Sequence, residues 1–212
     1  METKISQEVH TLDNGDYCHI GLQSSLISSM QKHKICCIFP SVLELNFNFD
    51  GLPIFKSCKT SFWSILGCIN NCTHSPVFPI GVFYGSGKPK PIENYMSLFI
   101  HDLNIALIDG IQCFQRTFKI SINAFVCDAP ANAYIKCIKP HNGYFGCSKC
   151  TNEGEWVEGR MTFTSGSSKR TNADFRAMQN EEHHIGQSPL LSLSVDMVEC
   201  FPLDYMHLVC LG

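Results

Sequence analysis

The sequence has little charge, no long hydrophobic run and no excess of basic residues. Charged residues make up 17% of its 212 residues, against about 25% in typical soluble proteins. Because 44% of the residues are hydrophobic, the chain can bury a core and is not expected to be mainly disordered. No stretch approaches about 18 uninterrupted apolar residues, so no membrane span is predicted. A net charge of -3 excludes a bulk basic field, and nucleic acid would have to bind at a local patch.

Cysteine is abundant, but the pattern is not that of a disulfide scaffold. The 13 cysteines are odd in number and irregularly spaced, and residues 1–16 are polar and lack the basic and apolar segments of a secretory signal. Disulfide scaffolds belong to oxidising compartments. We therefore expect an intracellular protein with reduced thiols, a few of which bind metal. Residues 208–212 are an apolar run, which leads us to expect a truncated reading frame.

The hydrophobic pattern predicts an α/β protein. Residues 43–50 alternate strictly between apolar and polar, which predicts a strand with one buried face. Further strands are predicted at residues 35–39, 61–69, 78–84 and 118–126, and a short helix at 24–33. A strong amphipathic helix is predicted over 91–111, with Pro91 in its first turn and Gly110 at its C-terminal cap.

Composition also predicts how the chain is divided. Residues 1–40 form an N-terminal extension and residues 41–138 the first part of the sheet domain. Residues 139–200 lack any long periodic segment and carry Cys, His, Gly and Ser, which is typical of an insertion. Residues 201–212 return to an apolar pattern and are expected to rejoin the core.

Two aspartates follow predicted strands. Gly51 and Pro53 are expected to break the first strand, which would leave Asp50 at its end, and Asp128 follows the strand 118–126. Two carboxylates at one sheet edge can hold Mg²⁺ or Mn²⁺, which prefer oxygen ligands and can promote phosphodiester cleavage. The alternative is structural: Asp before Gly often forms a turn, and Asp before Ala-Pro often caps a helix.

Cysteine and histidine cluster between residues 137 and 150. Cys147 and Cys150 form a CxxC pair, the spacing with which two thiolates bind one Zn²⁺. Cys137 and His141 lie just upstream and can complete the site, as can His183 or His184. A redox role is the rival, but no thioredoxin-like strand precedes the pair. Unliganded thiols in a cysteine-rich chain are the simplest alternative.

Two smaller features remain. Asp204 and His207 stand three residues apart, a spacing that puts both on one face of a helix, where they can bond each other or support a metal. The glycine-rich stretch 85–91 carries Lys88 and Lys90 but lacks the Walker spacing. It is expected to be either a solvated loop or a contact with a backbone phosphate.

Five segments occur in an order that resembles a known family. They are 48–53 (NFDGLP), 78–81 (FPIG), 125–131 (FVCDAPA), 137–150 (CIKPHNGYFGCSKC) and 201–207 (FPLDYMH). No single segment is specific, but the ordered set is similar to the DDE transposase catalytic domain encoded by CACTA/EnSpm-like (CMC) transposons, over roughly residues 40–212.

The resemblance implies a fold, an activity and partners. It implies a ribonuclease-H-like mixed sheet with helices on both faces, interrupted by a zinc-knuckle-type insertion. Asp50 and Asp128 would be the first two acidic ligands of catalytic Mg²⁺ or Mn²⁺, in DNA cleavage and strand transfer at transposon ends. Cys147 and Cys150, with Cys137 or His141, would hold structural Zn²⁺, while Asp204 and His207 would support the catalytic geometry.

The resemblance also implies a third acidic residue on a later helix. The sequence stops five residues after His207, so we expect this chain to be inactive. DNA and a second copy of the chain are the expected partners, with no membrane, and the nucleus is the expected location. The alternative function is a non-catalytic, zinc-containing interaction module that binds protein or nucleic acid.

Overall fold

The computed structural model describes residues 8–33, 39–54, 60–73, 75–164, 166, 168–204 and 210. The chain forms two compact units, residues 1–123 and 124–212. Most of the predicted strand at 35–39 lies outside the described residues. His207 also lies outside them.

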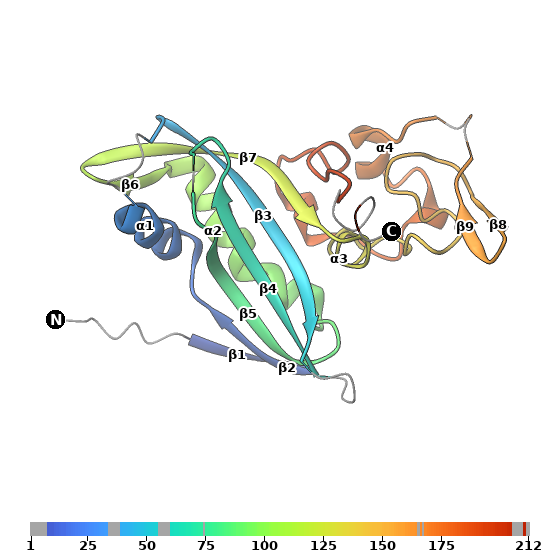
Figure 1. The fold of residues 1–212 in the computed structure, drawn as a ribbon, viewed down its shortest axis with the longest axis horizontal. Helices are drawn as coiled ribbons and strands as arrows, with labels where there is room; N and C mark the ends of the chain where they lie inside the picture. Colours follow the sequence, from blue (N-terminus) through green and yellow to red (C-terminus); the bar gives the residue numbers. More distant parts are fainter. Residues whose placement is uncertain are drawn as a thin grey trace. The chain divides into compact units, whose positions relative to one another are not determined.

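The first unit is built on a mixed seven-stranded sheet, which confirms the α/β class (Figure 1). Its order is β1-β2-β5-β4-β3-β7-β6. The strands are β1 (Glu8–Leu12), β2 (Gly15–His19), β3 (Val42–Pro53), β4 (Thr60–Ile69), β5 (Phe78–Ser86), β6 (Ile111–Cys113) and β7 (Arg116–Cys127). The pairs β1–β2, β2–β5, β5–β4, β4–β3 and β6–β7 are antiparallel. The arrows of β3 and β7 run in the same direction (Figure 1).

Two helices cover one face of this sheet. They are α1 (Leu22–His33) and α2 (Ile92–Asp109), which contact each other and both contact β5. The ring of Phe99 on α2 packs edge-on against Phe47 and Phe49 of β3, with centroids 5.1 and 5.5 Å apart. Gly110 caps α2 at a φ of 72°, as predicted, because only glycine adopts this conformation without strain.

The opposite face of the sheet carries none of the helices that the structure describes in this unit. Its side chains alternate with the buried ones along each strand, as the burial patterns of β3, β4 and β5 show. The resemblance implies helices on both faces, and in the described part of the first unit they lie on one.

The predicted helices and most of the predicted strands are confirmed, whereas the short strands β1, β2 and β6 were not foreseen. The helices at 24–33 and 91–111 and the strands at 43–50, 61–69, 78–84 and 118–126 all occur, within a few residues of their predicted ends. Residues 8–19, expected to belong to an extension, instead supply β1 and β2 to the sheet. Strands of five residues or fewer are too short for a clear period to develop.

The second unit has little regular structure, as expected for residues 139–200. It contains the helices α3 (Ala129–Ile135) and α4 (Asn172–Arg176), the hairpin β8 (Glu155–Val157) and β9 (Arg160–Thr162), and the 3-10 turns η1 (Glu181–His183) and η2 (Pro189–Ser192). Phe125 and Phe201 stack with centroids 5.0 Å apart, and the Phe125 amide donates to the Cys200 carbonyl. This contact brings residue 201 back beside the start of the unit.

No helix in the described part of the chain has both the length and the apolar character needed to cross a bilayer. No disulfide joins the cysteines that the structure describes.

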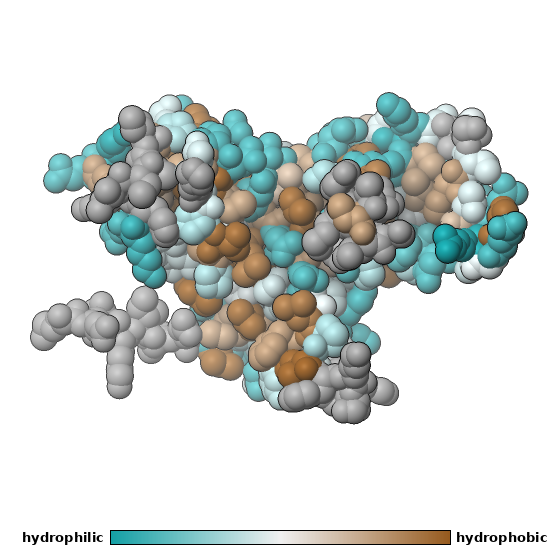
Figure 2. Space-filling model, in the orientation of Figure 1, coloured by the Kyte–Doolittle hydropathy of each residue, from teal (hydrophilic) through white to brown (hydrophobic). Residues whose placement is uncertain are grey.

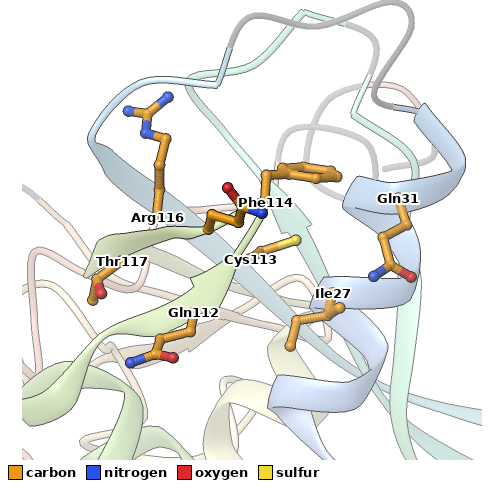
Figure 3. Close-up of a pocket in the computed structure, with 8 residues that line it drawn as sticks. Ile27, Gln31, Gln112, Cys113, Phe114, Arg116 and Thr117 are labelled. Atoms are coloured by element: carbon orange, nitrogen blue, oxygen red, sulfur yellow. The ribbon is translucent and has the colours of Figure 1, made fainter.

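The hairpin between β6 and β7 turns through two residues with positive φ, Phe114 (52°) and Gln115 (60°). This is the backbone of a type I′ turn, which favours Asn and Gly. The turn borders a hollow of about 470 Å³ that Ile27 and Gln31 of α1 close from the other side (Figure 3). Among the described residues, those that line the hollow include no carboxylate and no histidine.

Gln115→Gly should raise the free energy of unfolding by about 0.5–1 kcal/mol, because glycine removes the left-handed strain at an exposed position. Urea unfolding measures the change. Gln112→Gly, in the exposed row of β6, should lower stability instead, and a stabilising effect there would contradict the explanation.

Candidate functional site

Asp50 lies inside β3, three residues before its end, and not at the strand terminus as predicted. Gly51 does not break the strand. It pairs with Trp63 of β4, and a Cβ at residue 51 would come within 2.5 Å of the Trp63 ring. The lack of a side chain at residue 51 leaves room for the indole of Trp63, and β3 continues through Leu52 to Pro53. The half-buried Asp50 side chain belongs to the open face, in register with Ser64.

Asp128 follows β7 directly, as predicted, and forms the N-cap of α3. Its Oδ1 accepts a hydrogen bond of 2.6 Å from the Ala131 amide. The helix-cap alternative is therefore correct for this residue. It does not exclude metal binding, since a carboxylate has two oxygens and about four lone-pair sites.

A cavity of about 590 Å³ in the second unit brings four predicted site residues together. Asp128, His141, Cys147 and Asp204 all line it, with Lys139 and Lys149 among the remaining lining residues. The apolar part of the lining includes Met161, Phe163 and Leu203. The cavity thus combines carboxylate, imidazole, thiol and amine groups within one unit. The predicted pairing of Asp204 with His207 lies outside the described residues.

Cys147 and Cys150, the predicted zinc pair, lie in a turn in which two backbone amides point at one sulfur. The amides of Lys149 and Cys150 point at the Cys147 sulfur, with N···S distances of 3.4 and 3.3 Å. Burial and the adjacent Cys150 thiol raise the pKa of the Cys147 thiol. Amide hydrogens aimed at sulfur stabilise a thiolate, the form that binds zinc. These hydrogen bonds are compatible with the predicted role of Cys147 and do not test it.

The four predicted zinc ligands do not gather as one group. Among the described residues, no three of His, Cys, Asp and Glu come together at metal-binding distance. Cys137 is buried after α3 with a φ of 52°, and its carbonyl accepts from the Ile185 amide. Cys137 is thus held by the strand-like bridge between Ile138 and His184. The zinc site stays a prediction.

Two buried side chains with ring or guanidinium nitrogens lie near Cys147: Arg170, which the sequence did not single out, and His183, one of the candidate zinc ligands. Arg170 is 4% exposed and donates to the carbonyls of Cys147 and Cys150, at 3.5 and 2.9 Å. His183 is fully buried. Its Nδ1 lies 2.6 Å from the Phe145 carbonyl, while its Nε2 has no partner among the described residues. Burial is the main cause that lowers the pKa of His183 to about 3, so the ring is neutral.

Lys136 is the least expected group in the second unit. It is fully buried, and its amine lies 5.0 Å from the ring centre of Phe175 and 4.9 Å from that of Phe201. No hydrogen-bond partner for the amine occurs among the described residues. Desolvation first, and then Lys149 and Arg170, lower the pKa of Lys136 to about 7. No sequence signal marks it, because an isolated lysine normally predicts an exposed position.

In the first unit, Asp102 of α2 ties β2 to α1. Its Oδ2 lies 3.0 Å from His19 Nε2 and accepts from the Leu22 amide, the first of α1, at 2.9 Å. Burial alone would raise the pKa of Asp102, but the hydrogen bonds from His19 and Leu22 outweigh it and lower the pKa. These residues are about eighty apart in sequence, so no local pattern could find them.

Asp102→Asn should lower the free energy of unfolding at pH 7 by about 2 kcal/mol, because two hydrogen bonds to a charged acceptor are weakened. The folded pKa of Asp102 lies below its unfolded value of about 3.9, so its contribution is complete above about pH 4. The contribution disappears as pH falls through the folded pKa. Denaturant unfolding between pH 2 and 7 tests this, with the exposed Asp109→Asn as control. Equal losses in both variants would contradict it.

A scan of the chain against protein-family models finds no match, and a search of curated proteins finds no significant similarity.

Proposed function

We propose that the chain is a transposase-derived domain of ribonuclease-H-like type. In its ancestral activity, Asp50 and Asp128 hold divalent metal ions for DNA cleavage and strand transfer at transposon ends. DNA as the partner and the nucleus as the location follow from this proposal.

The strand order of the first unit carries the proposal. A ribonuclease-H-like sheet has three consecutive antiparallel strands and, after a helix, a fourth strand parallel to the first and beside it. Here β3, β4 and β5 are consecutive and antiparallel, α2 follows, and β7 lies next to β3. A parallel neighbour requires a crossover connection, which is usually a helix. Ligands of open α/β sheets bind outside the carboxyl ends of the strands, the part of β3 and β7 that carries the two aspartates.

An amide pair joins β7 to β3 within the first unit. Asn123 Nδ2 donates to Asn46 Oδ1 at 2.7 Å. Asp50 comes four residues after Asn46, and Asp128 comes five after Asn123. Asp50 and Asp128 belong to different units, so a cation bound by both is part of the proposal.

The chemistry of both residues fits a hard cation. Asp50 is half-buried on the polar face of β3, and the N-cap hydrogen bond of Asp128 uses one carboxylate oxygen and orients the other. When bound, Mg²⁺ or Mn²⁺ would polarise a phosphate and lower the pKa of a water molecule. The carboxylates themselves would hold the ions and fix their position.

Mn²⁺ titration followed by electron paramagnetic resonance tests the proposal on the whole chain. Asp50→Asn and Asp128→Asn should each weaken Mn²⁺ binding at least about tenfold, because each removes a charged ligand. Asparagine caps helices as well as aspartate does, so α3 should persist in the second variant. Glu44→Gln, on the same face of β3, is the matched control.

Binding that neither aspartate affects would overturn the metal site. A DNA-cleavage assay in Mn²⁺ on the same proteins then decides whether this chain retains activity. Cleavage that Asp128→Asn abolishes would establish an active enzyme.

The second candidate is the non-catalytic zinc-containing interaction module, and the knuckle geometry of Cys147 favours it. Zn²⁺ binding that depends on Cys147, without Mn²⁺ binding at Asp50 and Asp128, would support this reading over the first.

A further inference from the structure

The face of the sheet opposite α1 and α2 carries exposed apolar side chains, here called the apolar row. Leu52, Phe62 and Tyr84 stand side by side on β3, β4 and β5, because Leu52 pairs with Phe62 and Phe62 with Tyr84. They are 57%, 42% and 51% exposed. The ring centroids of Phe62 and Tyr84 lie 5.4 Å apart. Hydrophobic residues gather over this end of the sheet (Figure 2).

The next row of the same face extends the apolar surface towards the edge of the sheet. Val82 of β5 pairs with Cys18 of β2, which pairs with Val9 of β1. Val9 is 61% exposed and Val82 is half-buried, whereas the alternate residues Tyr17 and Phe83 are buried against α2. Contiguous exposed apolar surface of a few hundred Å² often marks an interaction site.

Carboxylates border the apolar row on both sides. Asp16 of β2 pairs with Tyr84 and is exposed. Its Oδ1 accepts from the Thr11 hydroxyl at 3.1 Å, and no lysine or arginine that the structure describes forms an ion pair with it. On β3, the half-buried Asp50 comes two residues before Leu52 and belongs to the same face. The apolar row therefore has a negative charge at each end.

The size of the apolar surface favours a single helix over a folded domain. The apolar row together with Val9 offers roughly 400 Å², at about 100 Å² for each half-exposed side chain, whereas a standard interface buries about 800 Å² on each partner. A second copy of the chain or a globular domain would need more than this. An amphipathic helix lays one apolar stripe on a sheet face, as α1 and α2 do on the opposite face.

The two carboxylates indicate the charge of such a helix. Asp16 and Asp50 are three strands apart in the sheet order, about 14 Å at about 4.8 Å per strand, and one row apart along the strands. The combined separation of about 16 Å corresponds to about ten residues of an α-helix. A helix with basic residues about ten positions apart and an apolar stripe between them matches the apolar row and both of its ends.

We propose that the apolar row docks a basic amphipathic helix of a partner protein, with apolar side chains on Leu52, Phe62 and Tyr84 and basic residues beside Asp16 and Asp50. This inference goes beyond the proposed function. Because Asp50 would contact the helix, a bound metal ion and a bound helix would compete for this carboxylate, and docking is best measured without metal.

Fluorescence anisotropy of the whole chain in EDTA tests the proposal with a labelled peptide of about 14 residues, composed of leucine and lysine in amphipathic helical order. The same peptide with glutamate in place of lysine is the charge control. The lysine peptide should bind at least about tenfold more tightly than the glutamate peptide, because like charges that face each other across an interface oppose binding.

Variants locate the binding on the apolar row. Phe62→Ala and Tyr84→Ala should each weaken binding of the lysine peptide at least about fivefold, a common effect of truncating an aromatic anchor. Asp16→Lys changes only an exposed side chain, and it should weaken the lysine peptide and strengthen the glutamate peptide, each at least about fivefold. Ile108→Ala removes an 82% exposed side chain of α2 and should change neither affinity.

Absence of binding by the lysine peptide, equal affinity for both peptides, or affinity that is unchanged in both alanine variants would overturn the proposal. So would a wild-type dimer in sedimentation that dissociates in Phe62→Ala, because a second copy would then occupy the apolar row. Mn²⁺ titration separates this inference from the proposed function. Asp16→Lys should bind Mn²⁺ like the wild type, so a failure of helix docking and a failure of metal binding are observed independently.

Discussion

Lys136→Met should raise the free energy of unfolding at pH 7 by about 3 kcal/mol. The lysine amine is fully buried between Phe175 and Phe201 and lacks a hydrogen-bond partner among the described residues. Burial of an amine without a counter-charge costs several kcal/mol, part of which the two ring faces offset. Methionine has a similar length and no charge, so it should keep the packing and remove the desolvation cost.

The cost of burying the Lys136 amine should also appear in the pH dependence of wild-type stability. The folded pKa of Lys136 is about 7, and its unfolded pKa is about 10.4. Between these values the unfolded chain binds more protons, so stability should rise with pH by up to about 1.4 kcal/mol per unit. Urea unfolding between pH 7 and 10 measures the slope.

The variants separate this explanation from a general loss of charge. In Lys136→Met the free energy of unfolding should no longer rise between pH 7 and 10. In Lys169→Met, at an exposed position, it should rise as in the wild type. A destabilised Lys136→Met protein together with a flat wild-type profile would mean that the amine has a stabilising partner.

Zinc should raise the free energy of unfolding of the second unit by about 3 kcal/mol at a free concentration a hundred times its dissociation constant. The Lys149 and Cys150 amides point at the Cys147 sulfur, which would favour its thiolate as one ligand of the proposed zinc site. Binding free energy at a site absent from the unfolded chain adds directly to folding free energy. Thermal melting of chelator-treated protein, with and without Zn²⁺, measures the gain.

Cys147→Ser should abolish most of this gain, whereas Cys200→Ser, a half-buried cysteine of the same unit, should not. Co²⁺ substitution adds a spectroscopic count of the thiolates that bind. A melting temperature that is indifferent to chelator and to Zn²⁺ in the wild type would remove the zinc prediction.

The sheet could be predicted because its long strands alternate clearly. Leu43, Leu45, Phe47 and Phe49 face α1 and α2, and the polar residues between them line the open face, as the period of two indicates. The short strands β1, β2 and β6 have no such signal. β1 and β6 pair with strands next to them in the sequence, whereas β2 joins the sheet through β5, more than sixty residues along the chain.

The candidate sites were predicted in part, for equally physical reasons. The CxxC spacing is local, and two backbone amides point at the Cys147 sulfur, whereas the zinc knuckle itself stays a prediction. The relation of His19 to Asp102 and the burial of Lys136 depend on tertiary packing, which spacing does not encode. Residues 61–69 read as a continuous apolar strand, so pattern alone could not tell the exposed Phe62 from the buried Trp63 and Ile65.

The central proposal is that Asp50 and Asp128 are ligands of the same metal ion. Cleavage of the backbone by bound Fe²⁺ with ascorbate tests it directly, because the radicals cut only the chain nearest the ion. The account predicts two groups of cuts, near residues 50 and 128, that disappear together in Asp50→Asn and in Asp128→Asn. Cuts at one position alone, or a variant that removes only the cuts beside its own residue, would contradict it.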